Sequence, residues 1–176
     1  MQDTATRERF EQAVLPHLDA AYNFARWLTR NEHDAQDVTQ EAFLRAFRFF
    51  DGYKGGNMRA WLLTIVRNTC YTWLHQNRPP DSAVEFDEEI HSSESSGGAD
   101  PELQVLASAD KETLHRALDE LPGIFREVLV LREMEGMSYK EIADVASVSI
   151  GTVMSRLARA RMRLRESLGA ALGKES

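Results

Sequence analysis

The clearest folding signal in this chain of 176 residues is the segment 138–164, which reads SYKEIADVASVSIGTVMSRLARARMRL. Ser138 and Glu141 have capping-box spacing, which predicts the start of a short helix over 139–146. Residues 147–149 then form a turn, and Ser149 can cap a long helix over 150–168. A short helix, a tight turn and a longer helix are the layout of a helix-turn-helix.

The predicted long helix has two different faces. Apolar residues recur at steps of three or four from Val153 to Leu168 and predict the buried face. Residues 151–165 contain five arginines and no acidic residue. We expect a second face to project outward into the major groove of DNA, where arginine pairs with guanine and hydroxyl groups contact bases or phosphates. A solvated basic helix end is the alternative. The candidate residues for DNA contact are Thr152, Ser155, Arg156, Arg159 and Arg163.

The net charge of −7 argues against a nucleic-acid ligand until it is divided along the chain. Residues 1–78 hold ten basic and nine acidic residues, and residues 113–176 hold the same numbers. Residues 79–112 hold one basic and ten acidic residues. Proline, serine and glycine within this central stretch oppose helix formation. We therefore predict an all-α chain with modules at 1–78 and 110–176, joined by a flexible acidic linker at 79–109.

Composition limits the class of protein. A hydrophobic content of 43% is typical of a globular chain. The apolar runs are far shorter than the ~18 residues of a membrane span, and we see no signal peptide. Cys70 is the only cysteine, so it cannot form an internal disulfide, and it fits a reducing compartment. We expect a cytoplasmic protein that does not insert into a membrane.

Helical periodicity runs through both modules. Apolar residues from Phe10 to Leu28 form one stripe, which Pro16 should interrupt with a kink or a helix break. Asn31 can cap a helix that runs to about residue 50. Glycines bracket a loop over 51–57, and another helix is predicted over 57–76. In the C-terminal module, helices over 111–120 and 124–134 precede the helix-turn-helix.

The helix predicted after Asn31 carries an exposed acidic stripe. A charged stripe is usually only a solvated face, but an exposed leucine within it indicates contact with another protein. The stripe comprises Asp34, Asp37, Gln40, Glu41, Leu44 and Arg48.

The segment from Gly52 to Pro80 contains no acidic residue. Aromatic rings beside cations suit unpaired bases, which stack on the rings while the cations neutralise phosphates. We favour nucleic-acid contact for Arg67, Asn68 and Tyr71. Trp61 fits either a base platform or the core, and we assign Trp73 to the core.

The chain resembles extracytoplasmic function (ECF) sigma factors, which are group IV of the sigma-70 class. Their core-binding region resembles residues 34–47, which read DAQDVTQEAFLRAF. Their promoter-melting helix resembles residues 59–68, which read RAWLLTIVRN. Their second DNA-binding domain resembles residues 121–128 and 151–161, which read LPGIFREV and GTVMSRLARAR. The resemblance covers nearly all of the chain outside the linker and the extreme termini.

This resemblance implies a bacterial transcription initiation subunit that performs no chemistry and holds no cofactor or metal. Its N-terminal domain, sigma region 2, would bind the clamp helices of RNA polymerase through Asp37, Gln40, Glu41 and Leu44. The same domain would open the −10 element and hold a flipped base in the loop 51–57. The implied −10 contacts are Tyr53, Lys54, Arg59, Trp61, Arg67, Asn68 and Tyr71.

The C-terminal domain, sigma region 4, would bind the polymerase flap and read the −35 element. The implied contacts are the residues already named on the last helix, Thr152, Ser155, Arg156, Arg159 and Arg163. An anti-sigma factor is a further implied partner. The family lacks the N-terminal extension and the middle domain of housekeeping sigma factors, and we see room for neither.

The acidic linker carries a hypothesis of its own. As a coil its 31 residues would span about 30 Å, although they can stretch to about 100 Å. Promoter elements two helical turns apart are separated by about 70 Å. We hypothesise that the carboxylates of Glu85, Asp87, Glu88 and Glu89 lie in a basic polymerase channel and mimic nucleic acid there.

Two alternative functions remain. A helix-turn-helix regulator that works without polymerase would leave residues 31–78 unexplained. A carboxylate-bridged metalloenzyme would use the Glu-x-x-His spacing found at residues 88–91 and 112–115. We find no partner glutamates for it on the neighbouring helices.

Overall fold

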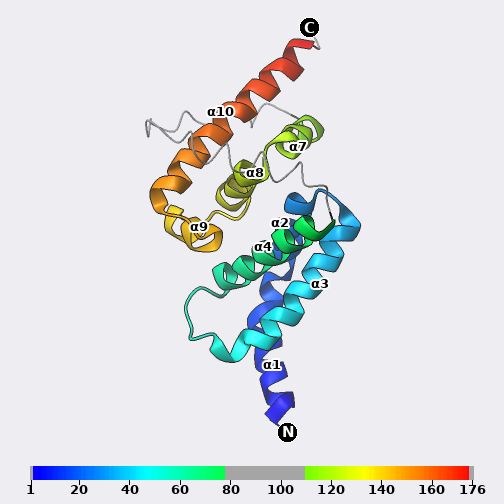
Figure 1. The fold of residues 1–176 in the computed structure, drawn as a ribbon, viewed down its shortest axis with the longest axis vertical. Helices are drawn as coiled ribbons and strands as arrows, with labels where there is room; N and C mark the ends of the chain where they lie inside the picture. The colour runs from blue at the N-terminus through cyan, green and yellow to red at the C-terminus, as the bar shows by residue number, and fades with distance from the viewer. Residues whose placement is uncertain (1, 78–109, 175–176) are drawn as a thin grey trace. The chain divides into compact units, whose positions relative to one another are not determined.

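The computed structural model describes residues 2–77 and 110–174, and every regular element within these ranges is helical (Figure 1). The helices form an N-terminal unit, α1 to α4, and a C-terminal unit, α7 to α10. The predicted all-α fold with two modules is confirmed. The predicted linker at 79–109, with its acidic residues and its Glu-x-x-His motif, lies outside the described residues.

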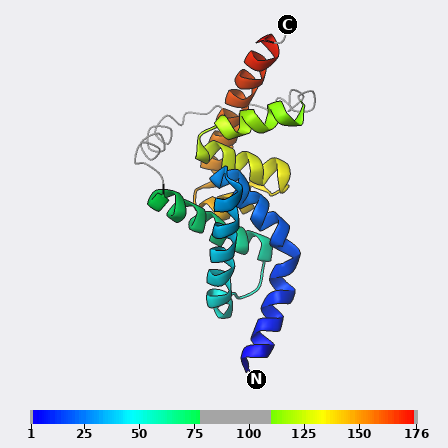
Figure 2. The ribbon, with the colours of Figure 1, turned by 90° about the vertical axis from the view of Figure 1, so that its right-hand side faces the viewer.

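The N-terminal unit contains four α-helices and two short 3₁₀ turns. The break expected at Pro16 is confirmed as the turn η1, where the chain changes direction in Figure 2. Asn31 caps α3 as predicted, because its side chain accepts a hydrogen bond from Asp34 N at 3.0 Å. The elements in order are α1 (Gln2–Val14), η1 (Leu15–His17), α2 (Leu18–Thr29), α3 (Glu32–Phe49), η2 (Phe50–Gly52) and α4 (Met58–Asn77).

The core of this unit lies where α2 packs against both α3 and α4, and α3 packs against α4 (Figure 1). Large buried side chains come from α2 and α4, whereas the buried positions of α3 are small residues. Small residues let α3 lie close to its neighbours and leave its polar side toward solvent. The buried residues of α3 are Ala35, Val38, Thr39, Ala42 and Ala46.

The C-terminal unit is built around α8, whose residues from Ile124 to Leu129 are all buried. The longest helix, α10, packs against α8 and α7 (Figure 1). It runs beyond the predicted end at residue 168. The elements in order are α7 (Lys111–Glu120), α8 (Gly123–Leu129), the π-helical turn η3 (Val130–Met134), α9 (Tyr139–Ala146) and α10 (Ile150–Lys174).

Local hydrogen bonds set the helix ends in this unit. The capping box is confirmed, because Ser138 N donates to Glu141 Oε1 at 3.0 Å and Glu141 N donates to Ser138 Oγ at 3.1 Å. Asp110 caps α7 by accepting a bond from Thr113 N at 2.7 Å, and this backbone bond holds the pKa of the Asp110 carboxyl below its usual value. The helix predicted over 124–134 is confirmed in its bounds, and its last turn is the π-helical η3.

Of the helices described, none has the combination of length and apolar composition that crossing a lipid bilayer demands.

Candidate protein and nucleic-acid interfaces

The outer side of α3 presents the acidic stripe that the sequence predicted. Asp37, Gln40, Glu41 and Leu44 are all exposed, which confirms the stripe, and their role in binding stays a prediction. Leu44 is 61% exposed, although its side chain is apolar. Glu41 Oε1 accepts a hydrogen bond from Arg45 Nε at 3.2 Å, one turn along the helix. The outer side of α3 therefore combines negatively charged side chains with exposed apolar surface.

The end of α3 adds exposed apolar residues that sequence reasoning missed. Phe47 is 42% exposed and Phe49 is 57% exposed. The run of aromatic residues at 47–50 was the available signal, since three phenylalanines within four positions cannot all face the core of one helix.

Tyr53 and Trp61 lie together in a cluster of aromatic rings. Their ring centroids are 5.2 Å apart with a tilt of 52°, and Tyr53 also stacks on Phe50 at 6.2 Å. The Tyr53 hydroxyl donates a hydrogen bond to Gly56 O at 2.6 Å. Tyr53 and Trp61 are therefore half-buried among protein rings, and Phe50 is a member of the cluster that the sequence did not single out.

The exposed side of α4 brings together three of the predicted residues. The Arg67 guanidinium lies over the Tyr71 ring, 4.7 Å from its centroid, and Asn68 beside it is exposed. Stacking orients a guanidinium and leaves its edge for hydrogen bonds. Lys54 is exposed on the loop and Arg59 is half-buried in the first turn of α4.

Trp73, which the sequence assigned to the core, is only half-buried.

The predicted DNA-contacting residues of α10 lie on one side of the helix. At 3.6 residues per turn, Thr152, Arg156, Arg159 and Arg163 span about 60° of the helix surface beside the buried row, and Ser155 lies next to them. The Arg163 guanidinium lies 5.0 Å from the centroid of the Phe125 ring.

Two members of this set differ from the outward-facing row that the sequence predicted. The exposed fraction of Ser155 is 8% and that of Arg156 is 7%. For Arg156 the position beside the buried side of the helix is the physical reason. The expectation that the whole set projects into solvent is therefore wrong for these two residues.

α10 also presents apolar side chains to solvent. Ile150, Met154 and Met162 are exposed by 46%, 42% and 52%. They follow one another at multiples of four residues, so they form a ridge that winds along the helix beside the basic residues.

Two buried arginines have structural roles that sequence reasoning missed. Arg161 Nη2 donates to Glu133 Oε1 at 3.2 Å and joins α10 to η3, and Arg161 is 5% exposed. Arg126 Nη1 donates to Leu121 O at 2.6 Å and holds the chain between α7 and α8. A pattern of arginines along one helix does not separate such residues from those that face a ligand.

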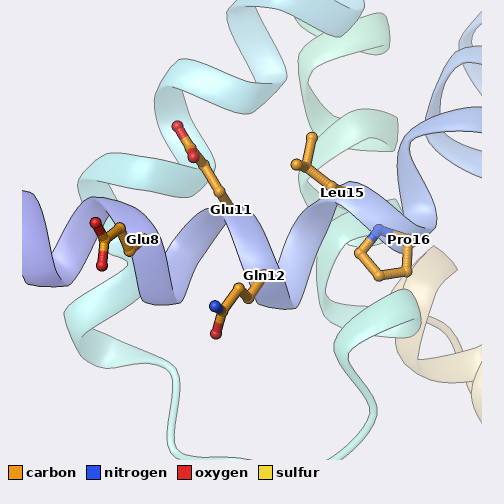
Figure 3. Close-up of a pocket in the computed structure, with 5 residues that line it drawn as sticks. All are labelled: Glu8, Glu11, Gln12, Leu15 and Pro16. Atoms are coloured by element: carbon orange, nitrogen blue, oxygen red, sulfur yellow. The ribbon is translucent and has the colours of Figure 1, made fainter.

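A pocket lies at the junction of α1 and η1, with Glu8, Glu11, Gln12, Leu15 and Pro16 around it (Figure 3). None of the predicted site residues is among them. The candidate interfaces are instead the outer sides of helices.

Both side chains of the Glu-x-x-His motif at residues 112–115 lie beside an oppositely charged or polar side chain of α7 itself. Glu112 Oε1 lies 3.4 Å from Arg116 Nη2, and His115 Nε2 lies 3.3 Å from Asp119 Oδ2. Within residues 2–77 and 110–174 no three histidine, cysteine or carboxylate side chains gather as metal ligands do.

Comparison with protein families matches both units of the chain. A family described as Sigma-70 region 2 matches residues 13–79, and one described as Sigma-70, region 4 matches residues 111–164. The chain is 36% identical over 166 residues to the ECF RNA polymerase sigma factor SigE of Mycolicibacterium smegmatis, which covers 94% of this chain and 64% of that protein. It is 34% identical over 170 residues to the RNA polymerase sigma-H factor of Pseudomonas aeruginosa, covering 92% of this chain and 87% of that protein.

Two solved structures are similar to this chain in fold. The sigma factor RpoE in complex with the anti-sigma factor NepR from Bartonella quintana has a TM-score of 0.67 and 30% identity, covering 92% of this chain and 98% of that chain. CnrH in complex with the cytosolic domain of CnrY has a TM-score of 0.58 and 28% identity, covering 97% of this chain and 91% of that chain.

Proposed function

Because the chain belongs to the ECF RNA polymerase sigma factors, we propose that it binds core RNA polymerase and directs transcription initiation at promoters with −10 and −35 elements. The observation that carries the proposal is that sigma regions 2 and 4 match one chain in that order, one in each unit. A helix-turn-helix regulator that works without polymerase accounts only for the second match. The 31 residues between the matches, 80–110, favour assignment to group IV, which has no middle domain.

The outer side of α3 is the proposed contact with the clamp helices of the polymerase. Asp37, Gln40 and Glu41 supply acidic and polar groups, and Leu44 supplies apolar surface that a partner can remove from water. α3 packs against both α2 and α4, so its outer side is presented by a helix that is already folded before binding. Such a face loses little conformational freedom on binding.

The loop after η2 and the outer side of α4 form the proposed −10 interface. The residues from Gly52 to Asn77 include no acidic residue, so the phosphate backbone meets no like charge there. Arg67 and Lys54 neutralise phosphates, and the Asn68 amide hydrogen-bonds a base edge. The proposed set comprises Tyr53, Lys54, Arg59, Trp61, Arg67, Asn68 and Tyr71. Binding at this interface offsets the unstacking of the melted bases, which costs on the order of a few kcal/mol per step.

The N-terminal half of α10 is the proposed reader of the −35 element in the major groove. Thr152 and Arg159, which are half-buried, are assigned to base edges and phosphates. Arg163, also half-buried, is assigned to the adjacent backbone, whereas Ser155 and Arg156, which are 8% and 7% exposed, are not assigned a DNA contact. The same domain is the proposed contact with the polymerase flap.

An anti-sigma factor is the proposed regulator. The RpoE structure is a complex with the anti-sigma factor NepR, and the CnrH structure is a complex with the cytosolic domain of CnrY. Their similarity to this chain supports a protein partner of this kind, and we propose that it covers the polymerase-binding surfaces. The protein is then an initiation factor of the cytoplasm that catalyses no reaction of its own.

A binding experiment with and without polymerase tests this function. Duplex promoter DNA is titrated with the chain alone, with core polymerase alone and with both together, and retardation in a gel reports binding. We expect promoter-specific binding only when both proteins are present. Equal specific binding by the chain alone would support the stand-alone regulator instead.

A further inference from the structure

The loop between η2 and α4 is closed on itself by one side chain. Tyr53 donates its hydroxyl hydrogen to Gly56 O at 2.6 Å, three residues along the chain. Gly55 and Gly56 have φ angles of 90° and 97°, which side chains rarely adopt. Two adjacent glycines give an unrestrained loop many backbone conformations. This hydrogen bond therefore restricts a segment whose conformational entropy would otherwise be high.

The ring that carries this hydroxyl is anchored to the rest of the N-terminal unit. Phe50 stacks on Tyr53 with an interplanar angle of 12°. Trp61 of α4 also contacts the Tyr53 ring, and the two ring centroids are 5.2 Å apart. Phe50 in turn meets Phe10 of α1 edge-on, with ring centroids 5.3 Å apart. Phe10 is 8% exposed, so the chain of rings ends in the buried part of the unit.

We propose that Tyr53 is a positioning residue, which holds the loop 53–57 ready for the unpaired bases of the −10 element without contacting a base itself. Its hydroxyl is engaged by Gly56 O, and protein rings lie against its own ring. Bases then meet the loop backbone and the outer side of α4, where Arg67 and Asn68 lie. A loop ordered in advance loses less conformational entropy on binding, so the hydrogen bond raises affinity at a distance from the DNA. This inference rests on the proposed −10 function.

The substitution Tyr53→Phe separates positioning from direct stacking, because it removes only the hydroxyl and keeps the ring. Holoenzyme is assembled from core polymerase and the full chain. The probe is the single non-template strand of a −10 element, taken from the strongest promoter in a run-off transcription library. Fluorescence anisotropy measures the affinity of the holoenzyme for this strand. Hydrogen exchange of residues 53–57 is measured on the same variant. Tyr22→Phe, on a half-buried tyrosine of α2, is the matched control.

We expect Tyr53→Phe to weaken binding about three- to tenfold, the range that one hydrogen bond contributes, and to speed exchange in the loop. Tyr22→Phe should change neither quantity, and −35 duplex binding should be unchanged in both variants. If the ring stacked on a base instead, Tyr53→Phe would keep wild-type affinity while Tyr53→Ala lost it, and the proposal would be overturned.

Further outcomes separate this proposal from the −10 function on which it rests. Faster exchange in Tyr53→Phe with unchanged affinity would show that the hydrogen bond orders the loop without serving DNA, which overturns the positioning role. If Tyr53→Phe has no effect but Asn68→Ala weakens binding, positioning by Tyr53 fails and the −10 function stands. If Tyr53→Phe, Arg67→Ala and Asn68→Ala all bind like the wild type, the −10 function itself fails.

Discussion

Replacing Leu44 by alanine should weaken binding to core polymerase without weakening the fold. Leu44 lies on the outer side of α3 and is 61% exposed. Complete burial of a leucine side chain is worth about 1.5–3 kcal/mol. The 61% that is exposed is available to a partner, and subtracting the β-carbon that alanine retains leaves about 0.7–1.4 kcal/mol, which is about a three- to tenfold increase in Kd. Alanine is a strong helix former, so α3 should keep its stability.

Leu15 provides a matched control for this substitution. It is 56% exposed, so Leu15→Ala removes similar apolar surface from the same unit, at η1 instead of α3. Each variant is labelled with a fluorophore and titrated with core polymerase, and thermal unfolding is followed in parallel. We expect a weaker complex for Leu44→Ala and wild-type affinity for Leu15→Ala, with both unfolding curves unchanged. Wild-type affinity of Leu44→Ala, or an equal loss in Leu15→Ala, would refute the reasoning.

Three further predictions concern the C-terminal unit. Arg159→Ala should weaken −35 duplex binding by the holoenzyme and reduce the slope of log K against log salt by about 1, whereas an unchanged slope would remove Arg159 from the phosphate contacts. Glu133→Gln should lower the free energy of unfolding by about 1–3 kcal/mol in chemical denaturation, because Arg161 is buried beside it, while Glu112→Gln on the exposed side of α7 should have no effect. Because the folded pKa of Asp110 is lowered, its stabilising contribution is complete above the unfolded pKa and is lost as pH falls through the folded value. Thermal unfolding should therefore show wild type losing stability relative to Asp110→Asn below about pH 4, and a constant difference across that range would contradict the shift.

Helix boundaries were predictable because helix ends depend on local chemistry. Asn31 and Ser149 were expected to cap α3 and α10, and both accept a hydrogen bond from a backbone N–H three residues later. Pro16 was expected to break the first helix, and the 3₁₀ turn η1 lies there. Each of these signals involves residues within one turn of each other, so no knowledge of tertiary structure was needed.

The roles of individual arginines and aromatic residues were not predictable in the same way. Arg159 and Arg161 look alike in the sequence, but Arg161 is 5% exposed and donates to Glu133, which lies 28 residues earlier, whereas Arg159 is half-buried. The family resemblance implied a −10 contact for Tyr53 but not its hydrogen bond to Gly56 O, which closes a loop whose two glycines have positive φ. The hydrophobic period continues through η3, so the sequence pattern does not indicate that this turn is π-helical. Contacts between distant segments and unusual backbone angles carry no signal at helical spacing.

We infer that this chain gives RNA polymerase its promoter specificity. Run-off transcription with core polymerase, on a library that varies the −35 and −10 sequences, measures this specificity. We predict transcripts from a restricted set of promoters that share both elements, and none from the same templates when the chain is omitted. Failure of every library member to support promoter-specific initiation, with a positive control sigma factor active in the same reaction, would contradict the claim.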